Sequence, residues 1–134
     1  MSTYLLTWKA DEWSYESLKE RLDRFSAGET VQRWSCGKSK SLSKGSRVFL
    51  MKQGKGKGGI FGSGRVVREP FEDEHFNDEK RTAGKSALYV MVDFDRLYDP
   101  LDDPKTGIKI DTYELKSLDG KLWKSQGSGK KIID

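Results

Sequence analysis

The 134-residue sequence has few of the residues from which most catalytic and metal sites are built. It contains one histidine, His75, and one cysteine, Cys36. A zinc or nuclease centre that needs two histidines therefore cannot be assembled, and no internal disulfide can form. Cys36 and His75 could act as nucleophile and base only if these two lone residues met by chance. A single cysteine also fits a reducing, cytoplasmic setting.

Long apolar runs are missing as well. None approaches the roughly 20 residues of a membrane-spanning helix. The residues up to Trp8 lack the basic start and the apolar stretch of a signal peptide, so we do not expect one. The length is that of one ordinary domain, and we expect residues 1–134 to form a single domain of a soluble protein.

Short matches to nucleotide-binding motifs fail on inspection. Gly37-Lys-Ser39 and Gly84-Lys-Ser86 end like phosphate-binding loops, but Gln32 and Glu79 occupy the positions where such a loop needs its first glycine. The stretch 54–59 matches a dinucleotide glycine pattern by letter, yet strand-like residues follow it where a helix should begin. We therefore expect a non-catalytic protein without metal or cofactor.

The charged residues are unevenly distributed. The formal net charge is +4. Lysines crowd residues 38–44 and 52–57, whereas acidic residues crowd 69–74 and continue at Asp78 and Glu79. A basic face opposite an acidic face suits a polyanionic partner such as nucleic acid. The alternative, with about equal weight for either lysine run alone, is a solvated loop that happens to be rich in lysine.

Hydrophobic periodicity predicts more strands than helices. Tyr15, Leu18, Leu22 and Phe25 recur at helical spacing and mark one helix that ends near Gly28. A shorter helix is expected from Asp111, followed by an extended tail, and residues 70–86 are expected to form a long polar loop. Apolar and alternating segments predict strands at residues 4–8, 29–34, 47–51, 60–67 and 87–94. The order favours an α+β domain with a curled, largely antiparallel sheet.

Three tryptophan-centred segments are the most informative feature. Trp8 closes the first predicted strand, Trp34 precedes Ser-Cys-Gly, and Trp123 precedes Lys-Ser-Gln-Gly-Ser-Gly129. A flat ring beside small polar residues can hold a flat polar ligand between stacking faces and hydrogen-bonding edges. The alternative is packing in the core for Trp8 and Trp34, and an anchor in a disordered tail for Trp123. Phe76, in the polar loop, could anchor that loop or cover a pocket.

In order along the chain, these segments resemble an EVE domain of the PUA-like superfamily. The resemblance covers nearly the whole chain and is similar in style to EVE modules joined to HNH nucleases or GTPase motors in modification-dependent restriction systems. Its segments are Tyr4-Leu-Leu-Thr-Trp8, Arg33-Trp-Ser-Cys-Gly37, Lys44-Gly-Ser-Arg-Val-Phe-Leu50, Gly59 to Pro70, Tyr89 to Phe94 and Trp123 to Gly129.

The resemblance implies a PUA-like pseudo-barrel of about five or six mostly antiparallel strands with two or three short helices. It also implies a pocket that holds a modified base, first of all a modified cytosine flipped out of DNA. Phe76 stands where the family pattern leads us to expect a tryptophan. The expected base-binding residues are Trp8, Trp34, Ser35, Phe76, Trp123, Ser125 and Gln126.

Lysines are the expected contacts to the nucleic-acid backbone. The phosphate-binding candidates are Lys38, Lys40, Lys52, Lys55, Lys57 and Lys130. A nuclease or NTPase effector, fused or separate, is the expected protein partner. Two alternatives stay open: an RNA-binding module of the broader PUA type that reads a modified or bulged ribonucleotide, and a protein-interaction or small-ligand domain whose aromatic residues are simply core.

Overall fold

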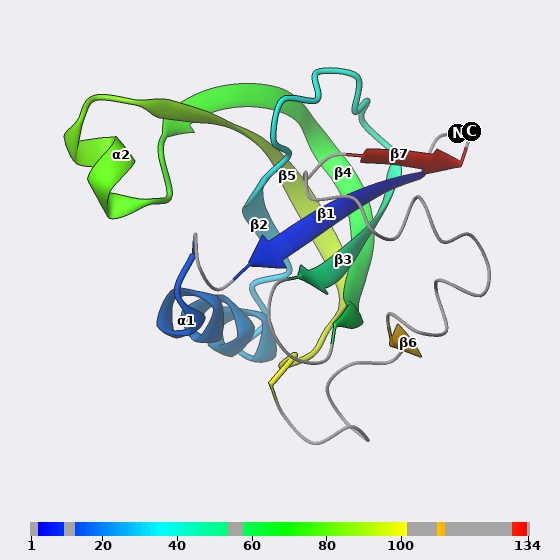
Figure 1. The fold of residues 1–134 in the computed structure, drawn as a ribbon. Coiled ribbons are helices and arrows are strands. Elements are labelled where there is room, and N and C mark those ends of the chain that lie inside the picture. Colours follow the sequence, from blue (N-terminus) through cyan, green and yellow to red (C-terminus); the bar gives the residue numbers. More distant parts are fainter. Residues whose placement is uncertain (1–2, 10–12, 54–57, 102–109, 112–129, 134) are drawn as a thin grey trace.

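The computed structural model describes residues 3–9, 13–53, 58–101, 110–111 and 130–133, the last two segments by their backbone alone. The chain forms a seven-stranded sheet in the order β2-β5-β4-β3-β1-β7, and β6 pairs with β4 beside this path (Figure 1). The elements are β1 (Thr3–Lys9), α1 (Tyr15–Ser26), β2 (Val31–Ser35), β3 (Arg47–Gln53), β4 (Gly59–Glu74), α2 (Asp78–Thr82), β5 (Ser86–Leu97), β6 (Ile110–Asp111) and β7 (Lys130–Ile133).

The sheet is mostly antiparallel, which confirms the expected α+β class. Among the strands of the described ranges, only β1 and β3 pair in parallel, in the register Thr3↔Arg47 to Lys9↔Gln53. β7 runs antiparallel to β1, and Thr3 pairs with Ile133 there. A side-chain hydrogen bond joins two strands that are not neighbours in the sheet: the Trp34 indole Nε1 of β2 donates to the Thr7 carbonyl oxygen of β1 at 3.1 Å. The sheet therefore curls back on itself as a pseudo-barrel.

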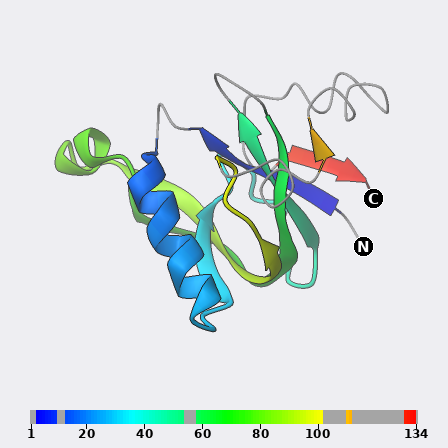
Figure 2. The same cartoon turned by 90° about the horizontal axis from the view of Figure 1, so that it is seen from below.

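Helix α1 follows the predicted pattern. The Ser14 side chain accepts a hydrogen bond from the backbone N–H of Ser17, which caps the first turn, and Leu18 and Leu22 are buried against the sheet. Gly28 has a φ of 99° after the helix, a conformation that glycine adopts without strain. Figure 2 shows α1 lying along one side of the curled sheet, next to β2. None of the helices in the described ranges is both long and apolar enough to cross a membrane.

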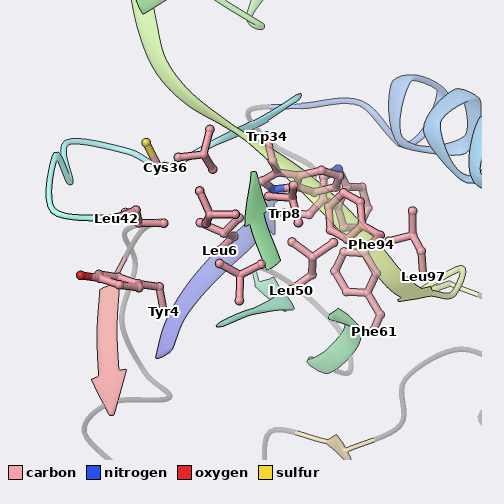
Figure 3. Close-up of a cluster of buried hydrophobic side chains, with 14 of the residues drawn as sticks. Tyr4, Leu6, Trp8, Trp34, Cys36, Leu42, Leu50, Phe61, Phe94 and Leu97 are labelled. Carbon is pink, nitrogen blue, oxygen red and sulfur yellow. The ribbon is translucent and has the colours of Figure 1, made fainter. Parts of the chain in front are cut away.

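The core lies inside the curl and beneath α1. Alternate residues of β1, namely Tyr4, Leu6 and Trp8, point into it, as strand geometry requires. They meet Trp34, Phe94 and other buried side chains (Figure 3). A smaller second cluster of Leu5, Met51 and Ile60 occupies the other face, with Phe49 packed against it. Both faces of the central strands are thus buried.

The predicted polar loop at residues 70–86 is wrong. β4 continues to Glu74 and pairs with β5 as far as Glu74↔Ser86, and α2 caps the resulting arm, which extends away from the barrel in Figure 1. Register shifts between Val66 and Phe71 interrupt the ladder and accommodate Pro70, because a bulge relieves proline of donating a ladder hydrogen bond. Asp111, where a helix was expected to begin, belongs to β6, and the remainder of that predicted helix lies outside the described residues.

Gly64 allows β4 to approach β5 closely where β5 supplies Phe94 to the core. A Cβ atom at this position would lie 2.5 Å from the Asp93 carbonyl oxygen and 2.9 Å from the Phe94 Cα. Because backbone atoms cannot move aside cheaply, we expect Gly64→Ala to lower the free energy of unfolding by about 3 kcal/mol. Urea denaturation measures this change. Glu72→Ala, at an exposed position of the same strand, is the control, and equal stability of the two variants would contradict the close approach.

Candidate nucleic-acid interface

Strand β2 lies at one edge of the sheet and separates two faces. Gln32 and Trp34 point to the core, while Arg33 and Ser35 point to the opposite face. β2 pairs with β5 in the register Trp34↔Val90 and Ser35↔Tyr89. Residues opposite each other in an antiparallel pair share a face, so Tyr89 lies on the same face as Ser35. Aromatic side chains from other segments gather around this edge strand.

We call these rings the aromatic cluster: Trp13, Trp34, Phe76 and Tyr89. The centroids of Trp13 and Trp34 lie 4.7 Å apart at an interplanar angle of 79°, an edge-to-face contact. Phe76 lies 6.2 Å from Trp13 and 6.5 Å from Tyr89. The cluster therefore joins the segment before α1, the edge strand β2, the tip of the arm and β5. Residues far apart in the sequence meet at one place, as at a binding site built on a rigid scaffold.

Trp34 and Trp8 are both buried in the core. Each is 1% exposed. The indole N–H of Trp8 donates to the Trp13 carbonyl oxygen at 2.9 Å, so both buried indoles have a backbone acceptor. The ring face of Trp34 is not open in this structure, because Trp13 and Phe94 pack against that ring. For Trp8 the geometry favours the packing alternative.

Arg21 of α1 brings a positive charge to the cluster. Its guanidinium carbon lies 5.1 Å from the ring centroid of Trp13 and 5.9 Å from that of Trp34. One of its N–H groups donates to the Arg33 carbonyl oxygen at 2.5 Å. Burial lowers the pKa of Arg21 to about 10, and the nearby positive charges of Arg33 and Arg24 act in the same direction. The group remains a cation at neutral pH.

Arg33 adds a second cation on the opposite face of β2. Its guanidinium carbon lies 4.0 Å from the ring centroid of Tyr89, and its Nη1 lies 2.9 Å from the Asp73 carboxylate. The hydrogen bond that Asp73 accepts from the Glu74 backbone N–H, followed by that from Arg33, holds the Asp73 pKa below its usual value. The Tyr89 hydroxyl donates to the Glu74 carbonyl oxygen at 2.5 Å, and burial raises the Tyr89 pKa.

Of the predicted base-binding residues, Phe76 and Ser35 also have defined positions. Phe76 is half-buried in the cluster with His75 at 4.5 Å between ring centroids. Ser35 is half-buried, and its Oγ accepts a hydrogen bond from the Gly37 backbone N–H at 3.3 Å. Trp123, Ser125 and Gln126 lie outside the described residues.

The predicted phosphate-binding lysines differ in their exposure and position. Lys38 and Lys40 are exposed on the connection between β2 and β3. Lys52 belongs to β3 instead of an exposed loop, is 5% exposed and lies opposite Trp8 in the parallel register; burial lowers its pKa. This burial leaves no basis for a phosphate contact by Lys52. Lys55 and Lys57 lie outside the described residues, and Lys130 is described only as part of the β7 backbone.

Sequence reasoning missed Trp13, Arg21, Arg33 and Tyr89. Trp13 precedes the predicted helix by two residues and belongs to none of the tryptophan-centred segments that suggest a binding site. A signal for Arg21 existed, because it is the third residue after Leu18 and therefore lies near the apolar side of α1. Arg33 and Tyr89 became significant only when the strand register placed them together.

The structure also bears on metal binding and on the reactivity of Cys36. In the described ranges, no three His, Cys, Asp or Glu side chains are grouped so that they could hold a metal ion. Cys36 is fully buried, and its thiol contacts the Ser39 carbonyl oxygen at 3.5 Å. Burial raises the pKa of this thiol to about 11, which opposes formation of the nucleophilic thiolate.

Comparisons with known proteins identify the fold. No protein-family model matches the chain, and no curated protein matches it significantly. A Pseudomonas syringae protein of solved structure has a TM-score of 0.55 and 19% identity, with 98% of this chain and 89% of that chain covered. A Pseudomonas putida protein gives 0.55 and 21%, with the same coverage. Human THYN1, solved in complex with 5-methylcytosine-containing DNA, gives 0.53 and 16%, with 88% of this chain and 75% of that chain covered.

These likenesses together with the curled sheet show an α+β, PUA-like pseudo-barrel. At identities this low they show the fold alone. The function of the chain has to be argued from its own residues.

The burial of Cys36 predicts slow thiol chemistry. With a pKa of about 11, the thiolate fraction at pH 8 is far below that of an unfolded cysteine. We expect an aromatic disulfide reagent to label the native protein at least about 100-fold more slowly than the urea-unfolded protein. The release of coloured thiolate measures both rates. Fast labelling of the folded protein at pH 8 would contradict the buried position and reopen a nucleophilic role.

Proposed function

We propose that this chain is a non-catalytic reader of a modified base, first of all a modified cytosine in DNA, and that the aromatic cluster receives the base. The observation that carries the proposal is the meeting of Trp34, Trp13 and Phe76 at one edge of the sheet. The Arg21 guanidinium lies beside the first two rings, and the Arg33 guanidinium lies over the neighbouring Tyr89. Rings stack on the faces of a base, and cations beside the rings favour the attached phosphates.

In the free protein, Trp13 occupies the space that the base would take. Its ring contacts both Trp34 and Phe76. Trp13 lies before α1, outside regular secondary structure, and its carbonyl oxygen is held by the Trp8 indole. The Trp13 ring can therefore leave by rotation of its side chain while the backbone stays anchored. A flipped base that replaces it would regain the contacts of that ring with Trp34 and Phe76.

The free-energy cost of flipping a base is close to the free energy that stacking returns, so a modification of the base can change the binding affinity. Flipping a base costs a few kcal/mol, and stacking on aromatic side chains returns about 1–3 kcal/mol per base. One buried methyl group adds only about 0.8 kcal/mol. Selectivity for a methylated base therefore requires a closely shaped site. Ser35, at the end of β2, could contact a polar base edge, and Ser125 and Gln126 of the tail segment are proposed to complete this reading.

The comparisons and the sequence support the same proposal from different directions. The fold is shared with human THYN1, a protein solved with 5-methylcytosine-containing DNA. The segment containing Trp34 and Ser35 matches the cage element of the EVE domain that the sequence resembles. By the same resemblance, we propose a place in a modification-dependent restriction system, in which a nuclease or NTPase on another domain or protein acts on the bound DNA.

The first test compares duplexes of one sequence that carry cytosine, 5-methylcytosine, 5-hydroxymethylcytosine, N4-methylcytosine or N6-methyladenine. Binding is followed by the fluorescence anisotropy of a dye on the duplex, and an RNA duplex and single-stranded RNA are included. We expect one modified-cytosine duplex to bind most tightly. Phe76→Ala should weaken that binding about 5- to 100-fold, since it removes one stacking face.

Phe49→Ala is the matched control for this titration. Phe49 is also a half-buried phenylalanine, but it packs against the second cluster on the other face of the sheet. Its truncation should leave the preference for the modified duplex unchanged. Equal losses in both variants would mean that Phe76 acts through stability alone. Tighter binding of RNA than of every DNA duplex would replace this proposal with the RNA-reading alternative.

Trp13→Ala tests whether Trp13 blocks the site. Removing a ring that must leave before the base enters should keep or strengthen binding of the preferred duplex, because less work is needed to open the site. The same anisotropy titration measures the change. A reduction in affinity as large as that of Phe76→Ala would show instead that Trp13 is a wall of the site and stays in place when the base binds.

A further inference from the structure

One face of β2, β5 and β4 carries two arginine side chains in the same cross-strand row. Arg33 of β2 and Arg68 of β4 both pair with Met91 of β5, from its two sides. In the next row, Tyr89 of β5 pairs with Phe71 of β4. The register therefore places two guanidinium groups beside two aromatic rings on one face of the sheet.

Each of these arginines stacks on a ring of the next row. The guanidinium carbon of Arg33 lies 4.0 Å from the Tyr89 ring centroid, and that of Arg68 lies 3.9 Å from the Phe71 ring centroid. The two rings are 6.2 Å apart. Stacking uses the flat face of a guanidinium and limits its motion, so its N–H edge remains able to bind oxygen atoms. Phosphate oxygens match that edge in a bidentate geometry.

The charged residues on this face allow it to bind an anion. Asp73 binds Arg33 at 2.9 Å, with 29% of the arginine side chain and 48% of the aspartate side chain exposed. Exposed pairs of this kind are worth no more than about 1 kcal/mol, so a phosphate can displace the carboxylate. Within the described part of the chain, Arg68 makes no ion pair. Two further acidic residues of β5 lie opposite or against other arginines: Asp93 pairs across the strands with Arg65, and Asp95 binds Arg47 at 2.8 Å.

We propose that Arg33 and Arg68 form a phosphodiester-binding site in which Asp73 holds the place of a phosphate until nucleic acid binds. The inference deepens and rests on the proposed function, because the Tyr89 ring beneath Arg33 also contacts Phe76 of the aromatic cluster at 6.5 Å. A phosphate bound here would flank the nucleotide whose base enters the cluster. The site adds arginine contacts to those expected from Lys38 and Lys40.

The test measures how affinity for the preferred modified duplex and for its unmodified counterpart depends on salt. Removal of one arginine–phosphate interaction should reduce the slope of log K against log salt by about 0.9. We expect Arg33→Gln and Arg68→Gln each to show this reduction with both duplexes. The preference for the modified duplex should stay unchanged, because backbone contacts carry no information about the base. Phe76→Ala should do the opposite: it should reduce the preference and leave the slope.

Arg47→Gln is a closely matched control. Arg47 binds Asp95 at 2.8 Å, stacks over Phe49 at 5.4 Å and has a side chain that is 31% exposed, much like Arg33. It lies on β3, three strands away from β2 in the sheet. Its replacement removes the same charge and the same kind of interaction, and should leave the salt slope at the wild-type value. Thermal denaturation of each variant confirms that it is folded.

Removing the Asp73 carboxylate, which competes with phosphate for Arg33, should strengthen binding. We expect Asp73→Asn to strengthen binding of both duplexes several-fold, because Arg33 no longer has to exchange a carboxylate for a phosphate. Glu72→Gln removes an equal charge from the neighbouring exposed position of β4 and is the control for net charge. Equal strengthening in both variants would reduce the effect of Asp73 to general electrostatics and would overturn its role as a stand-in.

The outcomes separate this inference from the proposed function. If the wild-type protein prefers the modified duplex while Arg33→Gln and Arg68→Gln keep its salt slope, the phosphodiester site is overturned and the base reader stands. If no duplex binds at either low or high salt, the proposed function fails. Inorganic phosphate is then the second probe. If inorganic phosphate changes the tryptophan fluorescence of the wild-type protein but not that of Arg33→Gln, the arginines form a site for free phosphate. If phosphate changes neither, the phosphodiester site is overturned together with the proposed function.

Discussion

The hydrogen bond from the Trp34 indole to the Thr7 carbonyl oxygen is the contact on which the arrangement of the site depends. It joins β2, at one end of the sheet, to β1, which lies four positions along the strand order. Backbone pairing alone leaves these strands apart, so a side chain from the edge strand completes the curl. The same ring packs against Phe94 and Trp13. Closure of the barrel and support for the aromatic cluster thus come from one residue.

The edge position of β2 gives the protein two distinct surfaces beside each other. On the core side, Trp34 supports Trp13 and, through it, Phe76. On the outer side, Arg33 stacks over Tyr89. In the proposed function, a base enters from solvent at the edge, where the rings lie, and the nucleic-acid backbone passes over the face that carries the guanidinium groups. Because strand side chains alternate between faces, the successive residues Arg33 and Trp34 of β2 belong to the cationic face and to the aromatic cluster, respectively.

Much of the fold could be predicted from the sequence, because it rests on local periodicity. The spacing of Tyr15, Leu18 and Leu22 marked α1, and the alternation along Leu88 to Phe94 marked β5. The arm could not be predicted, since Pro70 and the register shifts hide a strand that is held by pairing with β5. The arrangement of the candidate site could be anticipated only in part, and the binding roles of its residues stay predictions. Phe76 was anticipated from its unusual place among polar residues, whereas Arg33 and Arg68 become neighbours only through a register that no local pattern contains.

The packing of Trp13 against Trp34 has an optical consequence. Two indoles whose centroids lie 4.7 Å apart are close enough for their electronic transitions to couple, and we expect this coupling to contribute to the ultraviolet circular dichroism spectrum. Arg21, close to both rings, biases their local field. Any ligand that separates the two indoles uncouples them. The protein therefore contains its own spectroscopic gauge of whether this part of the molecule is closed, without an added label.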